Sequence, residues 1–304
     1  MNQQAAERRV LCVMSPSLIT RAVSALLVGP SDELESLFPD ELPRELDRAR
    51  SPASAIVRLA AKAYDIVLID HTSEGELTQE QLAYLRAAQA AARPETRFIV
   101  IASNTTSGKV VEALRHGVFA YFSRPFDPDT VRYAIIQAPT GSGWPFGIEV
   151  LSDDPDFISV RLRCCLETAE RMAQFMRELP CGLSDADKSS VSTAFSELLV
   201  NAIEHGGKLN SNEWVCVSRV RTKHTILYLI HDPGEGFSRP NLKHAAITNP
   251  PEDPTAHVEV RASQNMRPGG FGMLMATRLV DEVIYNARGN EVILIKYLEP
   301  GTNA

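Results

Sequence analysis

The sequence predicts two consecutive domains: an α/β doubly wound parallel sheet, followed by an α+β two-layer sandwich. The first half alternates short apolar runs with helical stretches, whereas antiparallel strand patterns and helices share the second half. A glycine- and proline-rich stretch, residues 138–147, separates the halves. We therefore expect a first domain over residues 1–137, a linker over 138–150 and a second domain over 151–304.

In the first half, apolar runs mark the strands and amphipathic stretches mark the helices. Strands are expected at Val10–Met14, Ile66–Asp70, Phe98–Ala102 and Phe119–Phe122, and helices at Pro16–Leu27, Ser107–His116 and Asp129–Gln137. A further strand is expected somewhere within Gly29–Arg50, but three prolines and many acidic residues hide its position.

In the second half, a long helix stands between two groups of strands. It begins at Ser184, with Asp187 three residues on in a capping-box pattern, and ends at Gly206–Gly207. Strands are expected at Phe157–Cys164, Trp214–Val220 and Ile226–Ile230, further helices at Glu167–Leu179 and Met273–Asp281, and a hairpin from Val283–Ala287 and Val292–Leu298 turning at Arg288–Gly289–Asn290. We expect the helices on one face of the sheet.

Composition narrows the class of protein. With 304 residues, 44% hydrophobic and 23% charged, the chain can build two ordinary globular cores. A formal charge of −7 argues against a protein whose main task is to hold nucleic acid. The five cysteines show neither metal-ligand spacing nor a disulfide framework, and no apolar run approaches the roughly 20 residues of a membrane span. A reducing cytoplasm is the compartment we expect.

The helix from Ser184 carries two polar side chains beside its buried stripe. Glu197 and Asn201 are four residues apart and flank the stripe on one side. The stripe itself is formed by Val191, Phe195, Leu198 and Ala202. Such a pair can present oxygens to Mg²⁺ or a base to a hydroxyl, although for these two residues alone a solvated helix flank is the better explanation.

Two glycine-rich segments follow. The strand Ile226–Ile230 leads into Asp232-Pro-Gly234-Glu-Gly236, where glycines let the backbone approach a ligand and the carboxylate can accept a hydrogen bond from a base. Gly269-Gly-Phe-Gly272 directly precedes a helix, whose N-terminus suits phosphate. Each segment alone is ambiguous, because a tight turn explains it too. The phosphate-binding motif G-x-x-x-x-G-K-[ST] is absent from the sequence.

The three segments in this order resemble the asparagine box and the two glycine boxes of the GHKL ATPase/kinase superfamily. Glu four residues before Asn, with His205-Gly206 after it, is closest to the anti-sigma-factor serine/threonine kinases. The resemblance covers roughly Leu151 to Leu298 and implies ATP and Mg²⁺ as cofactors. It further implies Glu197 as general base, Asn201 as Mg²⁺ ligand, Asp232 as adenine ligand, Gly234, Gly236, Gly270 and Gly272 around the nucleotide, and Ser238–Pro268 as a lid.

The resemblance also implies protein partners. These are an antagonist of the anti-anti-sigma type, phosphorylated on serine or threonine, and a sigma factor that the chain sequesters. A homodimer is a further expectation of this family, whereas direct contact with nucleic acid or a membrane is not expected. Lys243, Arg261 and Arg267 lie in the lid segment, and we interpret them as solvated cations.

The first half resembles a response-regulator receiver domain. Asp70 matches the phosphate-accepting aspartate, Ser103 the hydroxyl residue after the fourth strand, and Arg124 stands where that family has lysine. The acidic pair expected after the first strand is replaced by Met14–Ser15, so Mg²⁺ would lose its main protein ligands. We expect a receiver-like fold in which Asp70 is either an inert strand-end acid or a phosphorylation site.

Three other functions compete with a protein kinase. A nucleotide-gated binding module would need Asn201 and Asp232 but no base, so Glu197 favours the enzyme. A histidine kinase is disfavoured, because no histidine lies between Gly117 and Asn201, where its phosphoacceptor helix would stand. A DNA-binding regulator is disfavoured by the lack of a helix-turn-helix pattern with a basic recognition helix.

Overall fold

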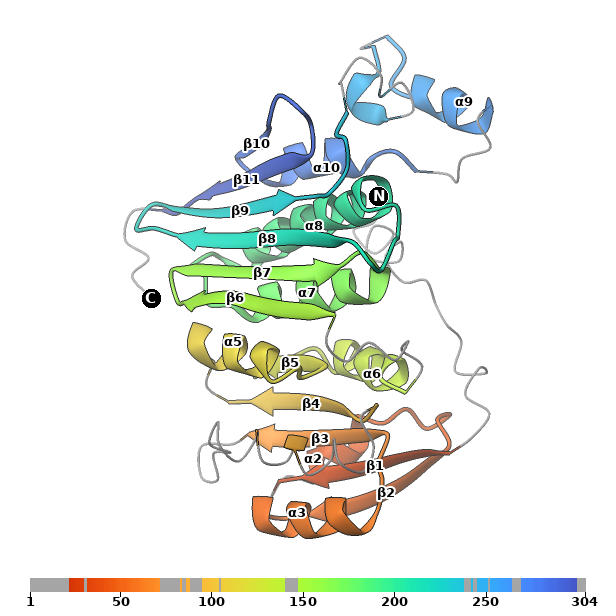
Figure 1. Ribbon diagram of the computed structural model, residues 1–304, viewed down its shortest axis with the longest axis vertical. Helices are drawn as coiled ribbons and strands as arrows, with labels where there is room; N and C mark the ends of the chain where they lie inside the picture. Colours follow the sequence, from red (N-terminus) through yellow and green to blue (C-terminus); the bar gives the residue numbers. More distant parts are fainter. Residues whose placement is uncertain are drawn as a thin grey trace. The chain divides into compact units, whose positions relative to one another are not determined.

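The computed structural model describes residues 22–29, 32–71, 83, 86–87, 95–103, 105–139, 147–237, 242, 245–250, 252–263 and 269–299. Contacts divide the chain into two compact units (Figure 1). The first comprises residues 1–103 and 122–143, and the second comprises residues 104–121 and 144–304. The larger segment of the second unit, residues 144–304, starts within the range predicted as a linker, 138–150, and residues 104–121 group with it.

A five-stranded sheet has the strand order β2-β1-β3-β4-β5. The pairings of β1 with β2, β1 with β3 and β3 with β4 are parallel. The order 2-1-3-4-5 is that of the flavodoxin-like doubly wound fold and confirms the predicted class. The strands are β1 (Val23–Val28), β2 (Arg44–Ala49), β3 (Ile66–His71), β4 (Arg97–Ala102) and β5 (Ala120–Ser123).

Most helices in the first half of the chain begin at a side-chain cap. The Ser51 hydroxyl accepts from the backbone N–H of Ser54, the Thr106 hydroxyl from that of Lys109, and the Asp127 carboxylate from that of Asp129. Such caps satisfy backbone donors that the first helical turn leaves open. The helices are α2 (Glu33–Ser36), α3 (Pro52–Ala61), α5 (Ser107–Arg115) and α6 (Pro128–Gln137).

The prediction of a helix over Pro16–Leu27 was wrong. Val23–Val28 is strand β1, where a helix over Pro16–Leu27 was expected, and the expected strand Val10–Met14 lies outside the described residues. β1 is central in the sheet and almost wholly buried, so it shows no two-residue alternation, and a short apolar run of this kind cannot be distinguished from a buried helix. The strand without a predicted position is β2, an edge strand with half-exposed polar side chains.

A six-stranded antiparallel sheet has the order β10-β11-β9-β8-β7-β6. Its strands are β6 (Ile148–Asp154), β7 (Phe157–Arg163), β8 (Trp214–Arg221), β9 (Thr225–His231), β10 (Glu282–Tyr285) and β11 (Glu291–Tyr297). β6 was not expected, and its first three residues occupy the end of the predicted linker. Along β8 and β9 every second residue is buried, as expected for a sheet covered on one face.

Three helices cover that face: α7 (Leu166–Glu178), α8 (Asp185–Asn201) and α10 (Gly272–Leu279) (Figure 1). The two-layer α+β class is therefore confirmed. Within this second unit the buried Arg171 of α7 donates to the carbonyls of Val118 and Phe119, which explains why residues 104–121 group with it. Among the described residues, no helix combines the length and the apolar character needed to cross a bilayer.

α8 is the predicted long helix, with one difference at its end. The Ser184 hydroxyl caps it by accepting from the N–H of Asp187 at 3.1 Å. Its predicted stripe is buried, with Phe195 only 1% exposed and its ring 5.2 Å from that of Tyr228. Instead of running as an α-helix to Gly206–Gly207, the chain changes at Asn201 into a π-helical turn, η2 (Ala202–Gly206).

Replacing Phe195 with alanine should destabilise the second unit by about 3–5 kcal/mol, because the substitution leaves a cavity between α8 and the sheet. Chemical denaturation of the full chain, followed by tryptophan fluorescence and circular dichroism, measures the effect. The control is Leu151→Ala on β6, where the side chain is 56% exposed and little should change. Equal effects of both substitutions would contradict this assignment of the core.

Candidate nucleotide-binding site

A cavity of about 540 Å³ lies in the second unit, beside the end of α8. Its volume falls within the usual range for small-molecule sites, about 300–1,000 Å³. Its lining includes Asn201, His205 and Gly206 from α8 and η2, Asp232, Gly234 and Gly236 from the loop after β9, and Tyr285, Gly289 and Val292 from the β10–β11 hairpin. Two of the three predicted sequence segments thus meet at one cavity.

The third segment reaches the site through Gly272, the first residue of α10. A Cβ atom at Gly272 would lie 2.4 Å from Oε2 of Glu197 and 3.6 Å from Nδ2 of Asn201. The first distance is shorter than real Cβ contacts, so a side chain at position 272 would displace the end of Glu197 from its place against the start of α10. Glu197 and Gly272 do not line the cavity themselves, but they lie beside Asn201, which does.

Asp232 is held on the other side by the π-helical turn. A Cβ atom at Gly206 would lie 2.1 Å from Oδ1 of Asp232, and one at Gly234 would lie 2.9 Å from the Cα of Gly206. The backbone N–H of Gly234 donates to the same Oδ1 at 2.8 Å. Since π-helical turns often occur at functional sites, η2 can be understood as the distortion that places Gly206 under this carboxylate.

The carboxyl group of Asp232 has an altered acidity. Partial burial raises its pKa above the ordinary value of 3.8, while the Gly234 N–H and the nearby charges of His231 and Arg288 act in the opposite direction. A half-buried acceptor of this kind forms a stronger hydrogen bond than a solvated one, because fewer water molecules compete for it.

Gly270 has a different environment from the other predicted glycines. It does not line the cavity; its carbonyl accepts from the N–H of Ala246, 2.8 Å away, at the start of the short helix η4 (Ala246–Thr248). Its φ of +91° lies in the region that favours glycine. The second glycine-rich segment therefore joins the site at Gly272 and the lid segment at Gly270.

The described part of the lid segment is more ordered than the sequence indicated. Helix α9 (Ala256–Ser263) carries His257, fully buried, whose ring lies edge-on to Phe271 at 4.5 Å. The interpretation of Arg261 as a solvated cation was wrong. It is 9% exposed, on the same face of α9 as His257, and its Nη2 would lie 3.8 Å from a Cβ at Gly269. Lys243 and Arg267 lie outside the described residues.

The side chains that could bind a metal at the cavity fit a magnesium–nucleotide complex better than a metal site formed by protein ligands alone. Within the described ranges, no group of three or more His, Cys, Asp or Glu side chains could hold a metal ion. Mg²⁺ commonly takes one or two protein ligands together with phosphate oxygens and water. The side-chain carbonyl of Asn201 beside the cavity, with Glu197 next to it, fits that requirement.

In the first unit, Asp70 lies at the end of β3 and is 3% exposed. Nη1 of Arg124 lies 3.3 Å from its Oδ1, and Nη2 of the same guanidinium lies 3.0 Å from Glu33. Ser103 directly follows the neighbouring β4, at the same edge of the sheet. Because the first strand is β1, Gly29 rather than Met14–Ser15 follows it; a Cβ at Gly29 would lie 2.8 Å from that of Asp70.

Two features of the site were missed by the sequence analysis. Gly206 was interpreted as a helix end and as part of the first motif, but its contact with Asp232 was not predicted: its missing side chain admits the Asp232 carboxylate. The turn Arg288–Gly289–Asn290 was predicted only as a turn, although its backbone contacts the loop after β9. Asn290, 4% exposed at the end of that turn, was the available signal, since a buried asparagine needs specific hydrogen-bond partners.

Replacing Gly206 with alanine should weaken ATP binding, because the added methyl would displace the Asp232 carboxylate. Isothermal titration with Mg-ATP measures the loss, expected to exceed about tenfold in affinity. Gly108→Ala on α5 is a matched control, since a Cβ there would meet only Thr106 Oγ1, at 3.9 Å. Unchanged ATP affinity in Gly206→Ala would show that Asp232 is not part of a nucleotide site.

Comparison with known proteins agrees with this geometry. Residues 164–296 match the family model of the histidine kinase-like ATPase domain. The serine-protein kinase RsbW of Oceanobacillus iheyensis is 26% identical over 145 residues, which cover 47% of this chain and 81% of that protein.

Solved structures of receiver domains are also similar to this chain. The signal receiver domain of an HD domain-containing protein from Pseudomonas fluorescens is 24% identical, covers 40% of this chain and 90% of its own, and has a TM-score of 0.34. A CheY-like receiver domain protein from Methanospirillum hungatei is 17% identical, with a TM-score of 0.35. The match covers 40% of this chain and 95% of that protein. The site described above lies within the segment, residues 164–296, that matches the model of the histidine kinase-like ATPase domain.

Proposed function

We propose that this chain is an ATP-dependent protein kinase that phosphorylates serine or threonine on a partner protein. The observation that carries the proposal is the convergence of three distant segments on one site. Gly272 lies against Glu197 and Asn201, while Gly206 and Gly234 lie against Asp232. The match of residues 164–296 to the model of an ATPase domain supports the ATP-binding part.

Adenine binding would depend on Asp232 and on the apolar wall of the cavity. The carboxylate can accept a hydrogen bond from the exocyclic amino group of the base, and its partial burial favours that bond over one to water. The apolar side chains that could contact the ring are Leu198, Ile230, Met273, Tyr285 and Val292. A mostly apolar wall with one directing polar group is typical of such sites.

The phosphates would lie toward Gly272 and the start of α10. This helix N-terminus offers free N–H groups and the positive end of a helix dipole. Asn201 would hold a bound Mg²⁺ through its side-chain oxygen, together with phosphate oxygens. Bound Mg²⁺ supplies positive charge that neutralises the transferring phosphoryl group.

Glu197 would act as the general base. Its carboxylate accepts the proton of the partner's serine or threonine hydroxyl as that oxygen forms its bond to the γ-phosphorus; the bond from the γ-phosphorus to the bridging oxygen breaks, and ADP leaves. Gly272 fixes the carboxylate beside Asn201, so that the base and the Mg²⁺ ligand stay together. Positioning of this kind accounts for most of the catalysis in phosphoryl transfer.

The partner that we propose is an antagonist of the anti-anti-sigma type, with a sigma factor as a second, sequestered partner. The similarity to the serine-protein kinase RsbW supports this choice. A nucleotide-gated binding module without transfer remains the second candidate, because the same cavity would serve it. The position of Glu197 against Gly272 favours the kinase, since a module that only binds nucleotide needs no base.

ATP affinity should fall as the pH is lowered through the raised pKa of Asp232. The ionised carboxylate is a stronger acceptor for the adenine amino group than the protonated one, so affinity is highest above this pKa and falls below it, at a pH above that of an ordinary aspartate. Titrations with ATP at pH values from 4 to 8 should show a midpoint of the affinity change at this pKa in the wild type and no such midpoint in Asp232→Asn. Asp156→Asn, in an exposed turn, should keep the wild-type profile. Identical profiles for Asp232→Asn and wild type would remove Asp232 from the site.

Substituting Glu197 with glutamine should leave ATP affinity within about threefold and reduce phosphotransfer at least about a hundredfold, as expected for loss of a general base. The assay uses γ-labelled ATP with candidate antagonist proteins and identifies the phosphorylated amino acid. Asp185→Asn, at the exposed start of α8, is the control that should keep full activity. Transfer at the wild-type rate by Glu197→Gln would reject the proposed base, whereas ATP binding without transfer to any partner would favour the binding module.

A further inference from the structure

The turn between β10 and β11, residues 286–290, holds the loop that carries the adenine ligand. We infer that Asn290 is a positioning residue: through its contacts with Asp232 it fixes the carboxylate that distinguishes adenine from other purines. The inference rests on the proposed function, because it gives Asn290 a role in the binding of adenine. Asn290 lies outside the three sequence segments predicted to form the site.

The main chain of Asp232 is bound by Asn290 in both directions. The backbone N–H of Asp232 donates to the carbonyl of Asn290 at 3.0 Å, and the side-chain Nδ2 of Asn290 donates to the carbonyl of Asp232 at 3.3 Å. Asn290 is 4% exposed, so water competes little for these bonds. The peptide units on both sides of the Asp232 Cα are therefore fixed relative to the hairpin.

Asn290 is itself oriented by Asn286. The Nδ2 of Asn286 donates to Oδ1 of Asn290 at 3.0 Å. The Oδ1 of Asn286 accepts from the backbone N–H groups of Gly289 and Asn290, at 2.7 and 3.2 Å. With its oxygen accepting and its nitrogen donating, the buried amide of Asn290 has a defined orientation. A network in which each member has partners is rigid, whereas one unpaired member would destabilise it.

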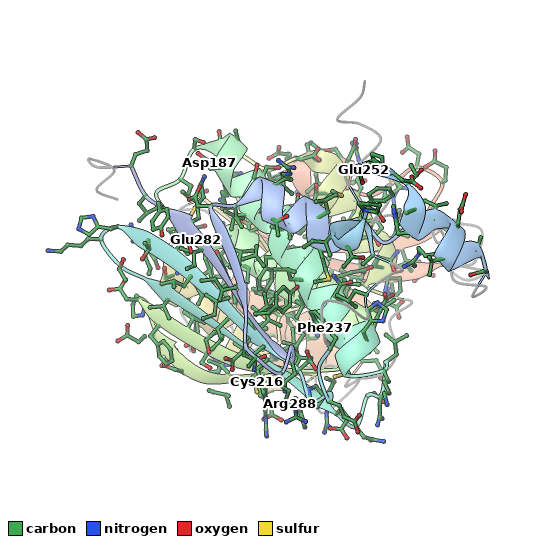
Figure 2. The ribbon with its side chains drawn as sticks, turned by 90° about the horizontal axis from the view of Figure 1, so that it is seen from above. Asp187, Cys216, Phe237, Glu252, Glu282 and Arg288 are labelled. Carbon is green, nitrogen blue, oxygen red and sulfur yellow. The ribbon has the colours of Figure 1, made fainter. Side chains whose placement is uncertain are left out.

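The outer part of the turn meets the outer part of the loop by direct backbone contact. A Cβ atom at Gly236 would lie 2.0 Å from the carbonyl oxygen of Arg288, and one at Gly289 would lie 2.3 Å from that of Phe237. Nε of Arg288 also donates to the carbonyl of Glu235 at 3.2 Å. Figure 2 labels Phe237 and Arg288 on these two segments. The loop after β9 is thus held from Asp232 to Phe237.

This arrangement matters for base recognition because a glycine-rich loop is otherwise mobile. Each glycine enlarges the set of backbone conformations that must be restricted before the carboxylate points at a ligand. A fixed carboxylate accepts from the amino group of adenine. The same carboxylate faces the carbonyl oxygen of hypoxanthine, with which it can form no such bond. Selectivity for adenine over hypoxanthine therefore measures how well Asp232 is held.

The test measures the affinities of ATP and inosine triphosphate for the full chain with Mg²⁺. The wild type should prefer ATP by about ten- to a hundredfold, the value of a hydrogen bond to a charged group. Asn290→Ala should reduce this ratio about fivefold or more. Asp232→Asn should also reduce it, and the double variant should lose little beyond Asp232→Asn alone, since the two residues act as a unit.

Two further variants separate positioning from folding. Asn290→Asp keeps the shape of the side chain and the acceptor for Asn286 but cannot donate to Asp232, so it should lose selectivity while the chain stays folded. Asn212→Ala, an exposed asparagine ahead of β8, should keep the wild-type ratio.

Each remaining result overturns a defined statement. Equal losses of ATP and inosine triphosphate affinity in Asn290→Ala and Asn290→Asp, with the ratio unchanged, would show a purely structural role and overturn the inference alone. A wild type that binds ATP without preference over inosine triphosphate would also overturn the inference and leave the kinase proposal standing. A wild type that binds neither nucleotide would overturn both.

Discussion

The candidate site depends on one carboxylate, that of Asp232, held half-buried at the end of a central strand. Burial raises the free energy of its charged form, so the surrounding backbone must stabilise it. The N–H of Gly234 stabilises the charge by donating to the carboxylate, and Gly206, which has no side chain, leaves the space that the carboxylate occupies. A side chain at either glycine would remove the place that the carboxylate occupies, which links the two sequence segments tightly.

The second unit gives this carboxylate a rigid frame. α8 is anchored to the sheet through Phe195 and carries Glu197 and Asn201 on its flank, so the same core contacts that stabilise the fold also set the polar side chains. The change from α-helix to π-helix after Asn201 turns the chain toward Asp232 without breaking the helix. Helix α8 supplies the proposed general base, Glu197. The loop after β9, held by its neighbours, supplies the group proposed to recognise adenine, Asp232.

Sequence patterns predicted the parts of this site that depend on local spacing. The four-residue interval between Glu197 and Asn201 fixes their common side of α8, and the Gly-rich segments adjoin a strand end and a helix start. Patterns could not predict features that arise from tertiary contact. The strand β1 has no alternation because both its faces are buried, Arg261 is buried by the lid's own packing, and the role of Asn290 appears only when the hairpin meets the loop.

The first unit shows how a related acidic site can be stable without the ligands of a metal. Asp70 has no exposed side-chain surface, and a carboxylate so placed needs nearby positive charge, which the guanidinium of Arg124 supplies. Glu33 contacts the same guanidinium, which fixes Arg124 between the two acids. Phosphorylation of Asp70 stays a prediction. The ion pair joins the end of β3 to Arg124, which directly follows β5.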